Sequence, residues 1–390
     1  MKKLCVLGIT GSIGLNVCSV VELNRNDFEI VGACFNSKYE IFDNIYLNHP
    51  TIKFVAVNNQ NAYMYLKNKY PELTIFYGDN YLINLIDSYP YNMVVNALVG
   101  FNGLVPSVHT LNKGIDLALA NKESLVVGGE LINDILKHTK AKLYPIDSEH
   151  VALSKLISSH KREDIDRLVI TASGGAFRDL TREELDNVTP SQALKHPSWK
   201  MGAKITIDSA SMMNKGFEIM EAYYLFNFPV DKIDVLLHDE SVIHSLIKMK
   251  DNSFIADLGP ADMRIPILYA LYEGNYHDFN DNKLSLEEIG SLHFRKFSNS
   301  RFPACELAKN ALRIGGSMGC VLNASNEVCN LAFRNGKIKF SQIEEIINKV
   351  MSLHKVVAKP TLEDYITINT WAMEITQKII EKGDIDELHC

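Results

Sequence analysis

Short apolar segments alternate with longer helical patterns over the first 146 residues of the chain. The short segments are rich in β-branched residues, and the stretches between them carry apolar residues at helical spacing. This alternation predicts a parallel, doubly wound α/β sheet whose strands are joined by crossover helices. The predicted strands are Leu4 to Leu7, Ile30 to Cys34, Phe54 to Val57, Met93 to Ala97, Asp116 to Ala120 and Lys142 to Ile146.

The pattern changes after Ser148 and indicates two further domains. Four apolar segments predict a second sheet mixed with helices: Leu168 to Ala172, Val235 to Leu237, Ile243 to Met249 and Ser253 to Leu258. A polar stretch rich in Asn, Asp and Ser follows, and helical spacing then returns from Ala304 onward. We expect an α/β domain over residues 1–147, a central α+β domain over 148–273, a linker over 274–301 and a small helical bundle over 302–390.

The composition excludes several classes of partner. The chain has 390 residues, and its formal net charge of -7 lacks the basic excess that binding to nucleic acid or an anionic membrane requires. No apolar run approaches the roughly 20 residues that span a bilayer. The seven cysteines include no CxxC pair and none between Cys34 and Cys305, which is typical of reduced thiols. We therefore expect a soluble cytoplasmic protein with a small-molecule partner.

A glycine-rich turn follows the first predicted strand. Gly8, Gly11 and Gly14 have the spacing GxxGxxG and open a helix, which is the context of a dinucleotide-binding turn. The pyrophosphate of the cofactor would lie at the N-terminus of that helix. The second strand is followed by Asn36-Ser37-Lys38 instead of the acid that would bind the ribose of NAD. A lysine suits a 2′-phosphate, so the sequence predicts NADPH.

Acidic and polar side chains follow two other predicted strands. Asn121-Lys122-Glu123-Ser124 comes after one strand, and Asp147-Ser148-Glu149-His150 comes after the next. Ligands of open α/β sheets bind at such strand ends. Asp147 and Glu149 can direct two carboxylate oxygens at one Mg²⁺ or Mn²⁺. The alternative is that Asp147 or Ser148 only caps the following helix.

A third metal ligand is expected farther along the chain. Asn214 and Glu218 stand four residues apart and so share one helix face. Glu221, one turn beyond, is the alternative ligand or a residue that supports the ligands. The donors that a phosphate monoester needs are nearby in Lys215, Ser209 and Ser211.

A segment between the predicted second-domain strands has the composition of a lid. His196-Pro-Ser-Trp-Lys-Met-Gly202 follows a Ser173-Gly174-Gly175 turn, and Trp199 stands beside Pro and Gly. Such a loop can close over a small ligand and exclude water, although a tryptophan can equally be packed in a fixed loop. We expect a flap at about residues 173–203.

Six clusters in one order resemble the motifs of the 1-deoxy-D-xylulose 5-phosphate reductoisomerase family, and the similarity continues through Leu322-Asn-Ala-Ser-Asn-Glu327. The clusters are Gly8-Ile-Thr-Gly-Ser-Ile-Gly14, Ala120-Asn-Lys-Glu-Ser-Leu125, Pro145-Ile-Asp-Ser-Glu-His150, Thr171-Ala-Ser-Gly-Gly175, His196-Pro-Ser-Trp-Lys-Met-Gly202 and Asp208-Ser-Ala-Ser-Met-Met-Asn-Lys-Gly216. The resemblance implies NADPH- and metal-dependent conversion of 1-deoxy-D-xylulose 5-phosphate to 2-C-methyl-D-erythritol 4-phosphate, in isoprenoid precursor synthesis, by a homodimer.

The resemblance also implies roles for individual residues. The metal ligands would be Asp147, Glu149 and Glu218, and the catalytic residues would be Lys122, Ser148 and Glu149. The cofactor would contact Gly8, Thr10, Gly11, Ser12, Ile13, Gly14, Asn36, Ser37, Lys38, Asn121 and Glu123. The substrate would contact Lys122, Ser148, Ser173, His196, Trp199, Ser209, Asn214 and Lys215, and the flap would carry His196, Trp199 and Met201.

Other function classes share part of this pattern. Semialdehyde dehydrogenases also have a GxxGxxG turn, but they need a cysteine nucleophile, which the interval between Cys34 and Cys305 does not contain. A non-catalytic NADP-binding sensor would keep the glycine turn, with the acids serving as caps and surface residues. Another metal-dependent NADP reductase is the third alternative.

Overall fold

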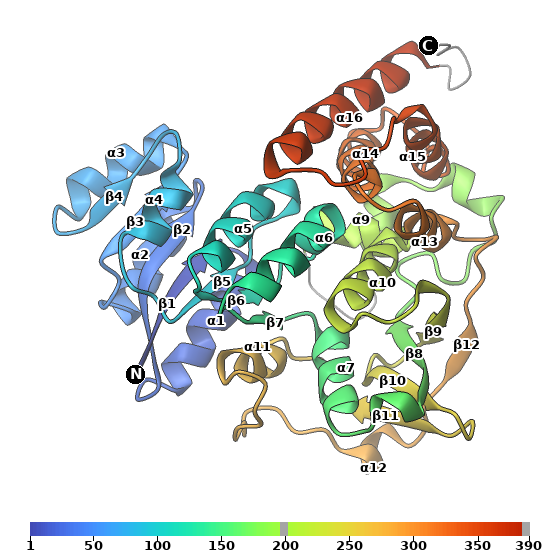
Figure 1. The fold of residues 1–390 in the computed structure, drawn as a ribbon, viewed down its shortest axis with the longest axis horizontal. Coiled ribbons are helices and arrows are strands. Elements are labelled where there is room, and N and C mark those ends of the chain that lie inside the picture. The colour runs from blue at the N-terminus through green and yellow to red at the C-terminus, as the bar shows by residue number, and fades with distance from the viewer. Residues whose placement is uncertain (196–201, 384–390) are drawn as a thin grey trace. The chain divides into compact units, whose positions relative to one another are not determined.

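The protein divides into two compact units in a computed structural model that describes residues 1–195 and 202–383. The first unit contains residues 1–121, 132–151 and 262–281 (Figure 1). The second contains residues 122–131, 152–261 and the described part of the chain from 282 onward. Each unit has one sheet of its own, so the predicted α/β architecture with a second, mixed sheet is confirmed.

The first unit contains a seven-stranded parallel sheet with the order β4-β3-β2-β1-β5-β6-β7. Its apolar strands are covered by helices and form a buried core, as expected for a parallel sheet. The six predicted strands are all present. The strands are β1 (Lys2–Leu7), β2 (Phe28–Phe35), β3 (Phe54–Val57), β4 (Thr74–Phe76), β5 (Met93–Asn96), β6 (Asp116–Leu119) and β7 (Leu143–Pro145).

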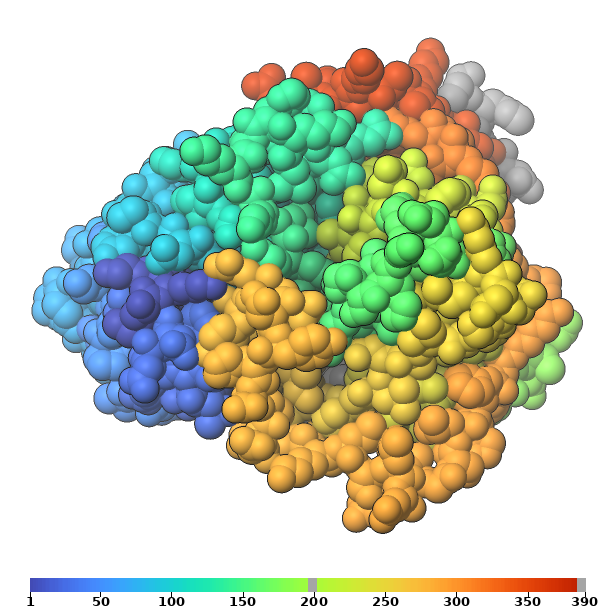
Figure 2. Space-filling view, turned by 60° about the horizontal axis from the view of Figure 1, so that its bottom comes forward, coloured from blue at the N-terminus to red at the C-terminus, as the bar shows by residue number. Residues whose placement is uncertain are grey.

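Six helices belong wholly to the first unit, and one of them was expected elsewhere. They are α1 (Ser12–Leu23), α2 (Tyr39–Asn48), α3 (Gln60–Lys69), α4 (Tyr81–Asp87), α5 (Leu104–Asn112) and α11 (Arg264–Leu271). We expected α11 in the central domain, but Ile267 and Leu271 pack into the core of the first sheet. The ring of Tyr272 lies 4.8 Å from that of Phe28 in an edge arrangement. Figure 2 shows this gold segment beside the blue N-terminal residues.

The second unit contains a five-stranded mixed sheet with the order β11-β10-β8-β9-β12. Strand β12 lies inside the expected linker and pairs antiparallel with β9, so residues 274–301 do more than connect two domains. Its side chains are exposed, as on an edge strand, and so its sequence lacked the apolar signal of a strand. The strands are β8 (Ile165–Ala172), β9 (Ile233–His238), β10 (Ile243–Met249), β11 (Phe254–Leu258) and β12 (Phe294–Lys296).

Helices of the second unit include the predicted C-terminal bundle. Gly216 allows α10 to pack closely on α13, because a Cβ there would lie 3.0 Å from the carbonyl oxygen of Ala304. The helices are α8 (Pro190–Ala193), α9 (Ala203–Ala210), α10 (Met213–Phe226), α12 (Leu286–Ile289), α13 (Ala304–Ile314), α14 (Met318–Arg334), α15 (Gln342–Leu353) and α16 (Leu362–Lys382). Helices α6 (Glu123–His138) and α7 (Ser148–Ser158) contribute residues to both units. Among the described residues, no helix has the length and hydropathy of a membrane span.

Candidate active site

The glycine turn joins β1 to α1 in a conformation that only glycine fits. Gly8 has φ 86°, and a Cβ at this position would lie 2.7 Å from the carbonyl oxygen of Ala97. A Cβ at Gly14 would lie 2.4 Å from the carbonyl oxygens of Gly8 and Ile9. The cap of α1 is Gly11, whose backbone N–H donates to the carbonyl oxygen of Gly8 over 3.0 Å. The turn thus leaves the N-terminus of α1 without a capping side chain, which is the arrangement that binds pyrophosphate.

Asn36, Ser37 and Lys38 lie at the same edge of the sheet as the glycine turn. They follow β2, which pairs parallel with β1 so that Leu7 is opposite Cys34. All three residues are exposed, and the backbone N–H of Gly8 donates to the carbonyl oxygen of Cys34 over 2.9 Å. The lysine side chain is therefore available to a charged group bound at this edge.

The neighbouring strands β6 and β7 also end in polar residues. The side-chain N–H groups of Asn121 donate to the carbonyl oxygens of Leu98 and Gly100, each over 2.9 Å. This residue therefore supports the loop after β5, and a Cβ at Gly103 would lie only 2.0 Å from its side-chain oxygen. Its contact with a cofactor was expected from the sequence, whereas this structural role was not.

Asp147 and Glu149 flank Ser148 where α7 begins, after β7. The carbonyl oxygen of Asp147 accepts from the backbone N–H groups of His150 and Val151, and the hydroxyl of Ser148 donates to Glu149 Oε2 over 2.8 Å. Both acids are partly buried. Two carboxylates in this setting are hard oxygen donors of the kind that Mg²⁺ and Mn²⁺ prefer. The donor set therefore fits a divalent cation.

Four polar side chains of the second unit meet at the start of α10. Lys122 Nζ donates to Asn214 Oδ1 over 3.0 Å and to Glu218 Oε1 over 3.2 Å. Asn214 Nδ2 also donates to Glu218 Oε1, over 2.6 Å, and Lys215 donates to the other oxygen of the same carboxylate. Glu218 is only 1% exposed and the two lysines at most 6%. Two ammonium groups around one carboxylate leave a positive charge, which suits a phosphate.

The backbone before α10 brings this cluster into place. Met212 has φ 64°, a left-handed conformation that is rare outside glycine and that is often found at functional sites. Its carbonyl oxygen accepts from the backbone N–H of Gly216 over 3.0 Å, which closes the first turn of α10. The alternative ligand Glu221 is fully buried one turn farther along the helix.

Ser173 and Ser209 lie on segments that touch each other. Gly175, with φ 66°, packs so closely on the end of α9 that a Cβ there would lie 2.5 Å from the carbonyl oxygen of Ser209. The hydroxyl of Ser173 accepts from the backbone N–H of Gly175 over 3.3 Å. Ser211, by contrast, is buried and accepts from the backbone N–H of Met213, so its hydroxyl supports the turn before α10. The flap residues His196, Trp199 and Met201 lie outside the described part of the chain.

A buried ionic network behind this cluster was not predicted from the sequence. Lys204 Nζ donates to Glu123 Oε1 over 2.7 Å and to Asp208 Oδ2 over 3.1 Å. Burial alone would raise the pKa of Glu123, but the ammonium group of Lys204 lowers it below its usual value. Burial would lower the pKa of Lys204, yet the charges of Asp208 and Glu123 raise it. Both groups are therefore charged at neutral pH.

The same network continues onto α14. From the sequence, this segment could be predicted only as a helix, by the spacing of its apolar residues. Asn326 and Asn330 stand four residues apart, and each donates a side-chain N–H to Asp208 Oδ1, over 2.9 and 2.7 Å. Asn326 belongs to the Leu322–Glu327 motif, to which the sequence alone gave no role.

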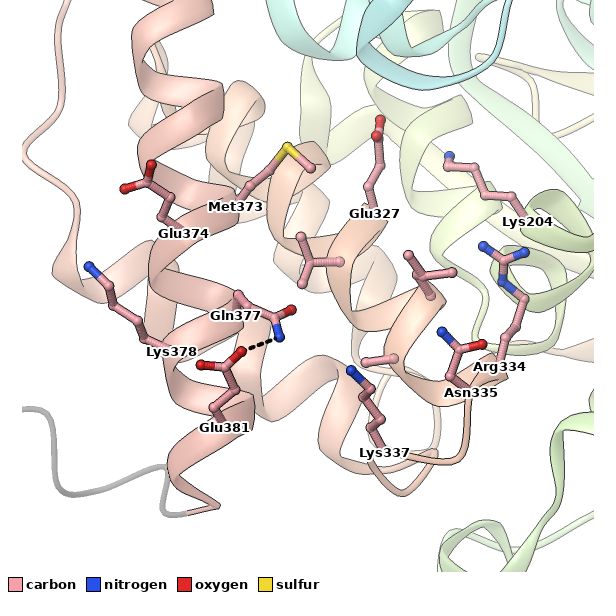
Figure 3. A pocket seen from close by; sticks show the side chains of 13 residues that line it. Lys204, Glu327, Arg334, Asn335, Lys337, Met373, Glu374, Gln377, Lys378 and Glu381 are labelled. Carbon is pink, nitrogen blue, oxygen red and sulfur yellow. Dashed lines mark hydrogen bonds between the residues drawn. The ribbon is translucent and has the colours of Figure 1, made fainter.

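A pocket of 670 Å³ lies between α14 and α16 (Figure 3). Lys204, Glu327 and Arg334 line one side of it, and side chains of α16 such as Gln377 and Glu381 line the opposite side. Of the residues predicted for cofactor, metal or substrate, none that the structure describes lines this pocket. Its volume therefore does not identify the reaction centre.

A parallel sheet with a glycine-rich turn after its first strand, beside a second domain that carries a buried cluster of charged side chains, is typical of dinucleotide-binding enzymes. Family models for 1-deoxy-D-xylulose 5-phosphate reductoisomerase match residues 4–129, and models for its C-terminal domains match residues 143–226 and 258–375. The chain belongs to the 1-deoxy-D-xylulose 5-phosphate reductoisomerase family. The resemblance stated from the motifs is thereby confirmed, and so is the prediction that the chain is an enzyme.

Relatives and solved structures agree with this assignment over nearly the whole chain. The reductoisomerase of Exiguobacterium sp. is 42% identical over 98% of this chain and its own full length, and that of Bacillus subtilis is 45% identical over 93% and 96%. The Zymomonas mobilis enzyme in complex with NADPH has a TM-score of 0.89 at 33% identity, covering 97% of this chain and 99% of its own. A reductoisomerase with NADPH, fosmidomycin and magnesium has a TM-score of 0.91 at 31% identity, covering 98% and 100%.

Proposed function

We propose that this enzyme converts 1-deoxy-D-xylulose 5-phosphate to 2-C-methyl-D-erythritol 4-phosphate with NADPH and one divalent cation. The observation that carries the proposal is the buried cluster of Lys122, Asn214, Lys215 and Glu218 in a chain of this family. It offers hydrogen-bond donors for a phosphate and a carboxylate for a metal within one group of contacts. A sensor without catalysis would have no need of such a cluster.

NADPH is proposed to bind at the edge of the first sheet. Solved relatives contain NADPH, and the turn keeps the tight backbone path of a dinucleotide-binding loop, because a Cβ at Gly8 or Gly14 would clash with backbone carbonyl oxygens. The exposed Lys38 supports the choice of NADPH over NADH, since its ammonium group can pair with a 2′-phosphate. NADPH supplies the hydride when bound, and the chain holds its pyrophosphate at the N-terminus of α1.

Mg²⁺ or Mn²⁺ is proposed to bind to Asp147, Glu149 and Glu218. The solved relative that contains magnesium supports the metal, and the oxygen donors of these residues suit it. When bound, the cation supplies a Lewis acid that polarises the substrate oxygens. Ser148, whose hydroxyl already contacts Glu149, is proposed to bind the same end of the substrate.

The phosphate end of the substrate is proposed to bind to Ser173, Ser209, Asn214 and Lys215. The Ser173 turn and the end of α9 are in contact through Gly175, which supports the proposal that both serines bind the phosphate. Lys122 holds its ammonium group in place with Asn214 and Glu218, where it adds positive charge next to the negative charge that develops during the rearrangement. The flap residues His196, Trp199 and Met201 are proposed to exclude water.

The first test is a spectroscopic assay of NADPH oxidation. We expect absorbance at the nicotinamide band to fall when 1-deoxy-D-xylulose 5-phosphate is added in the presence of Mg²⁺ or Mn²⁺, and to stay constant after chelation of the metal. NADH should serve at least about tenfold less efficiently, because it cannot pair with Lys38. NADPH that binds without ever being oxidised would sink the proposed reaction, and equal use of NADH would sink the role of Lys38.

We also propose a homodimer that works in the cytoplasm, with the cofactor bound at the glycine turn of the first unit. The resemblance to the family supports the dimer, and the six described cysteines, all buried free thiols, suit a reducing compartment. Light scattering is expected to give twice the chain mass of 43.9 kDa. A mass of one chain at micromolar concentration would exclude the dimer.

A further inference from the structure

We propose that Asp208 is a positioning residue for substrate binding, which acts by tying Lys204 and Glu123 to the end of α9. This inference rests on the proposed function, and it assigns a role to Asp208 and Lys204, neither of which is proposed to touch substrate or cofactor. Asp208 is 3% exposed and stands directly before Ser209, which is proposed to hold the substrate phosphate. Any shift of its side chain is therefore transmitted to the neighbouring residue on the same helix.

The carboxylate of Asp208 is held on both of its oxygens. Oδ1 accepts from Asn326 Nδ2 and Asn330 Nδ2, and Oδ2 accepts from Lys204 Nζ. Both asparagines are only 1% exposed, and they belong to one face of α14. Since a hydrogen bond to a buried carboxylate is stronger than one between neutral groups, this arrangement fixes the end of α9 against α14.

Lys204 connects this anchored end of α9 to Glu123. Its ammonium group bridges Asp208 and Glu123, while its carbonyl oxygen accepts from Asn330 Nδ2 over 2.9 Å. Glu123 begins α6 and is joined by one peptide bond to Lys122. The two side chains diverge, because Lys122 contacts Asn214 and Glu218, whereas Glu123 contacts Lys204.

One network thus sets the positions of two proposed substrate-binding residues, Lys122 and Ser209. It holds Lys122 through the adjoining Glu123, and it holds Ser209 through the adjoining Asp208. Substrate contacts require placement within a fraction of an ångström, so a loosened anchor lowers binding and turnover even when no contact is deleted. The glycine turn that is proposed to bind NADPH lies in the other unit and has no residue in this network.

The test is a kinetic comparison of wild type and Asp208→Asn in the NADPH oxidation assay. The amide keeps the shape of the side chain but loses the charge that Lys204 needs. We expect the KM for 1-deoxy-D-xylulose 5-phosphate to rise about tenfold or more with a lower kcat, while the KM for NADPH changes less than about threefold. A substrate KM within about twofold of wild type, or equal changes in both KM values, would overturn the inference.

Asp234→Asn is the control, because it removes the carboxylate of another salt bridge in the same unit. Asp234 on β9 pairs with Arg167 on β8, and neither residue belongs to the network. This variant is expected to leave the substrate KM unchanged.

If Asp208→Asn does not fold, Asn326→Ala and Asn330→Ala each remove one donor, and each should raise the substrate KM about threefold. Unchanged KM values in both would overturn the inference, whereas an inactive wild type would refute the proposed function instead.

Discussion

Replacing Glu218 by glutamine is expected to lower turnover by about three orders of magnitude while NADPH binding stays within about twofold of wild type. The proposed metal would lose one of its three carboxylate ligands, and glutamine offers a neutral oxygen in its place. In addition, Lys122 and Lys215 would lose the buried carboxylate that they share. The loss of this shared charge should lower the free energy of unfolding by about 3 kcal/mol.

A measurement of metal binding distinguishes the loss of a metal ligand from the loss of stability in Glu218→Gln. Titration with Mn²⁺ followed by electron paramagnetic resonance should give at least about hundredfold weaker binding in Glu218→Gln than in wild type. Circular dichroism would show whether the variant is folded under the same conditions. NADPH binding, followed by its fluorescence, provides the second control because the glycine turn belongs to the first unit.

Glu221→Gln is the informative comparison, because Glu221 is equally buried one turn farther along α10. If Glu218 is the ligand, Glu221→Gln should weaken Mn²⁺ binding less than Glu218→Gln does, by about 10- to 100-fold, as expected for a residue that only supports the ligands. Full activity of Glu218→Gln together with lost Mn²⁺ binding of Glu221→Gln would transfer the ligand role to Glu221.

Strands of the first sheet could be predicted because burial on both faces leaves an uninterrupted apolar run. Strand β5 (Met93–Asn96) is buried at every position, and its sequence is unmistakable. The three-residue strands β4 (Thr74–Phe76) and β12 (Phe294–Lys296) carry no such run, since β4 is partly exposed and β12 is exposed throughout. The apolar pattern therefore finds the central strands but misses one edge strand of each sheet, β4 and β12.

The site could be predicted where its residues are close in sequence. Asn214 and Glu218 stand four residues apart on α10 and are hydrogen-bonded, as their spacing alone indicates. The partners of Asp208 on α14 are 118 and 122 residues away, and no local spacing indicates them. Only the packing of α9 on α14 shows that these asparagines surround a carboxylate.

Long-range contacts also explain why α11 belongs to the first unit, although the sequence placed it in the central domain. Its apolar residues predict a buried helix, but they do not say which core it joins. The hydroxyl of Tyr272, just after α11, donates to Asp27 over 2.6 Å, and Lys2 Nζ donates to the carbonyl oxygen of Leu271. These partners are more than 240 residues apart in the chain. The helix thus returns to the first unit through long-range contacts that no sequence window contains.

Substitution of Lys215 by alanine is expected to raise the KM for 1-deoxy-D-xylulose 5-phosphate about a hundredfold and to lower kcat much less. Lys215 is 5% exposed, so its ammonium group pairs with a phosphate in surroundings where water screens little of the attraction. Lys232→Ala is the control, because that lysine is only partly buried and pairs with Asp166 over 3.1 Å. It should leave the KM unchanged.

A structural role of Lys215 predicts a different pattern. Because Lys215 also contacts Glu218, its loss could act through that carboxylate and not through the phosphate. The substrate without its phosphate group, 1-deoxy-D-xylulose, distinguishes the two. If Lys215 binds the phosphate, wild type and Lys215→Ala should turn over this compound with kcat/KM values within about threefold of each other, since the deleted contact has no partner in either case. A loss as large as that seen with the phosphorylated substrate would show that Lys215 serves Glu218, and the phosphate site would then depend on the two serines and Asn214.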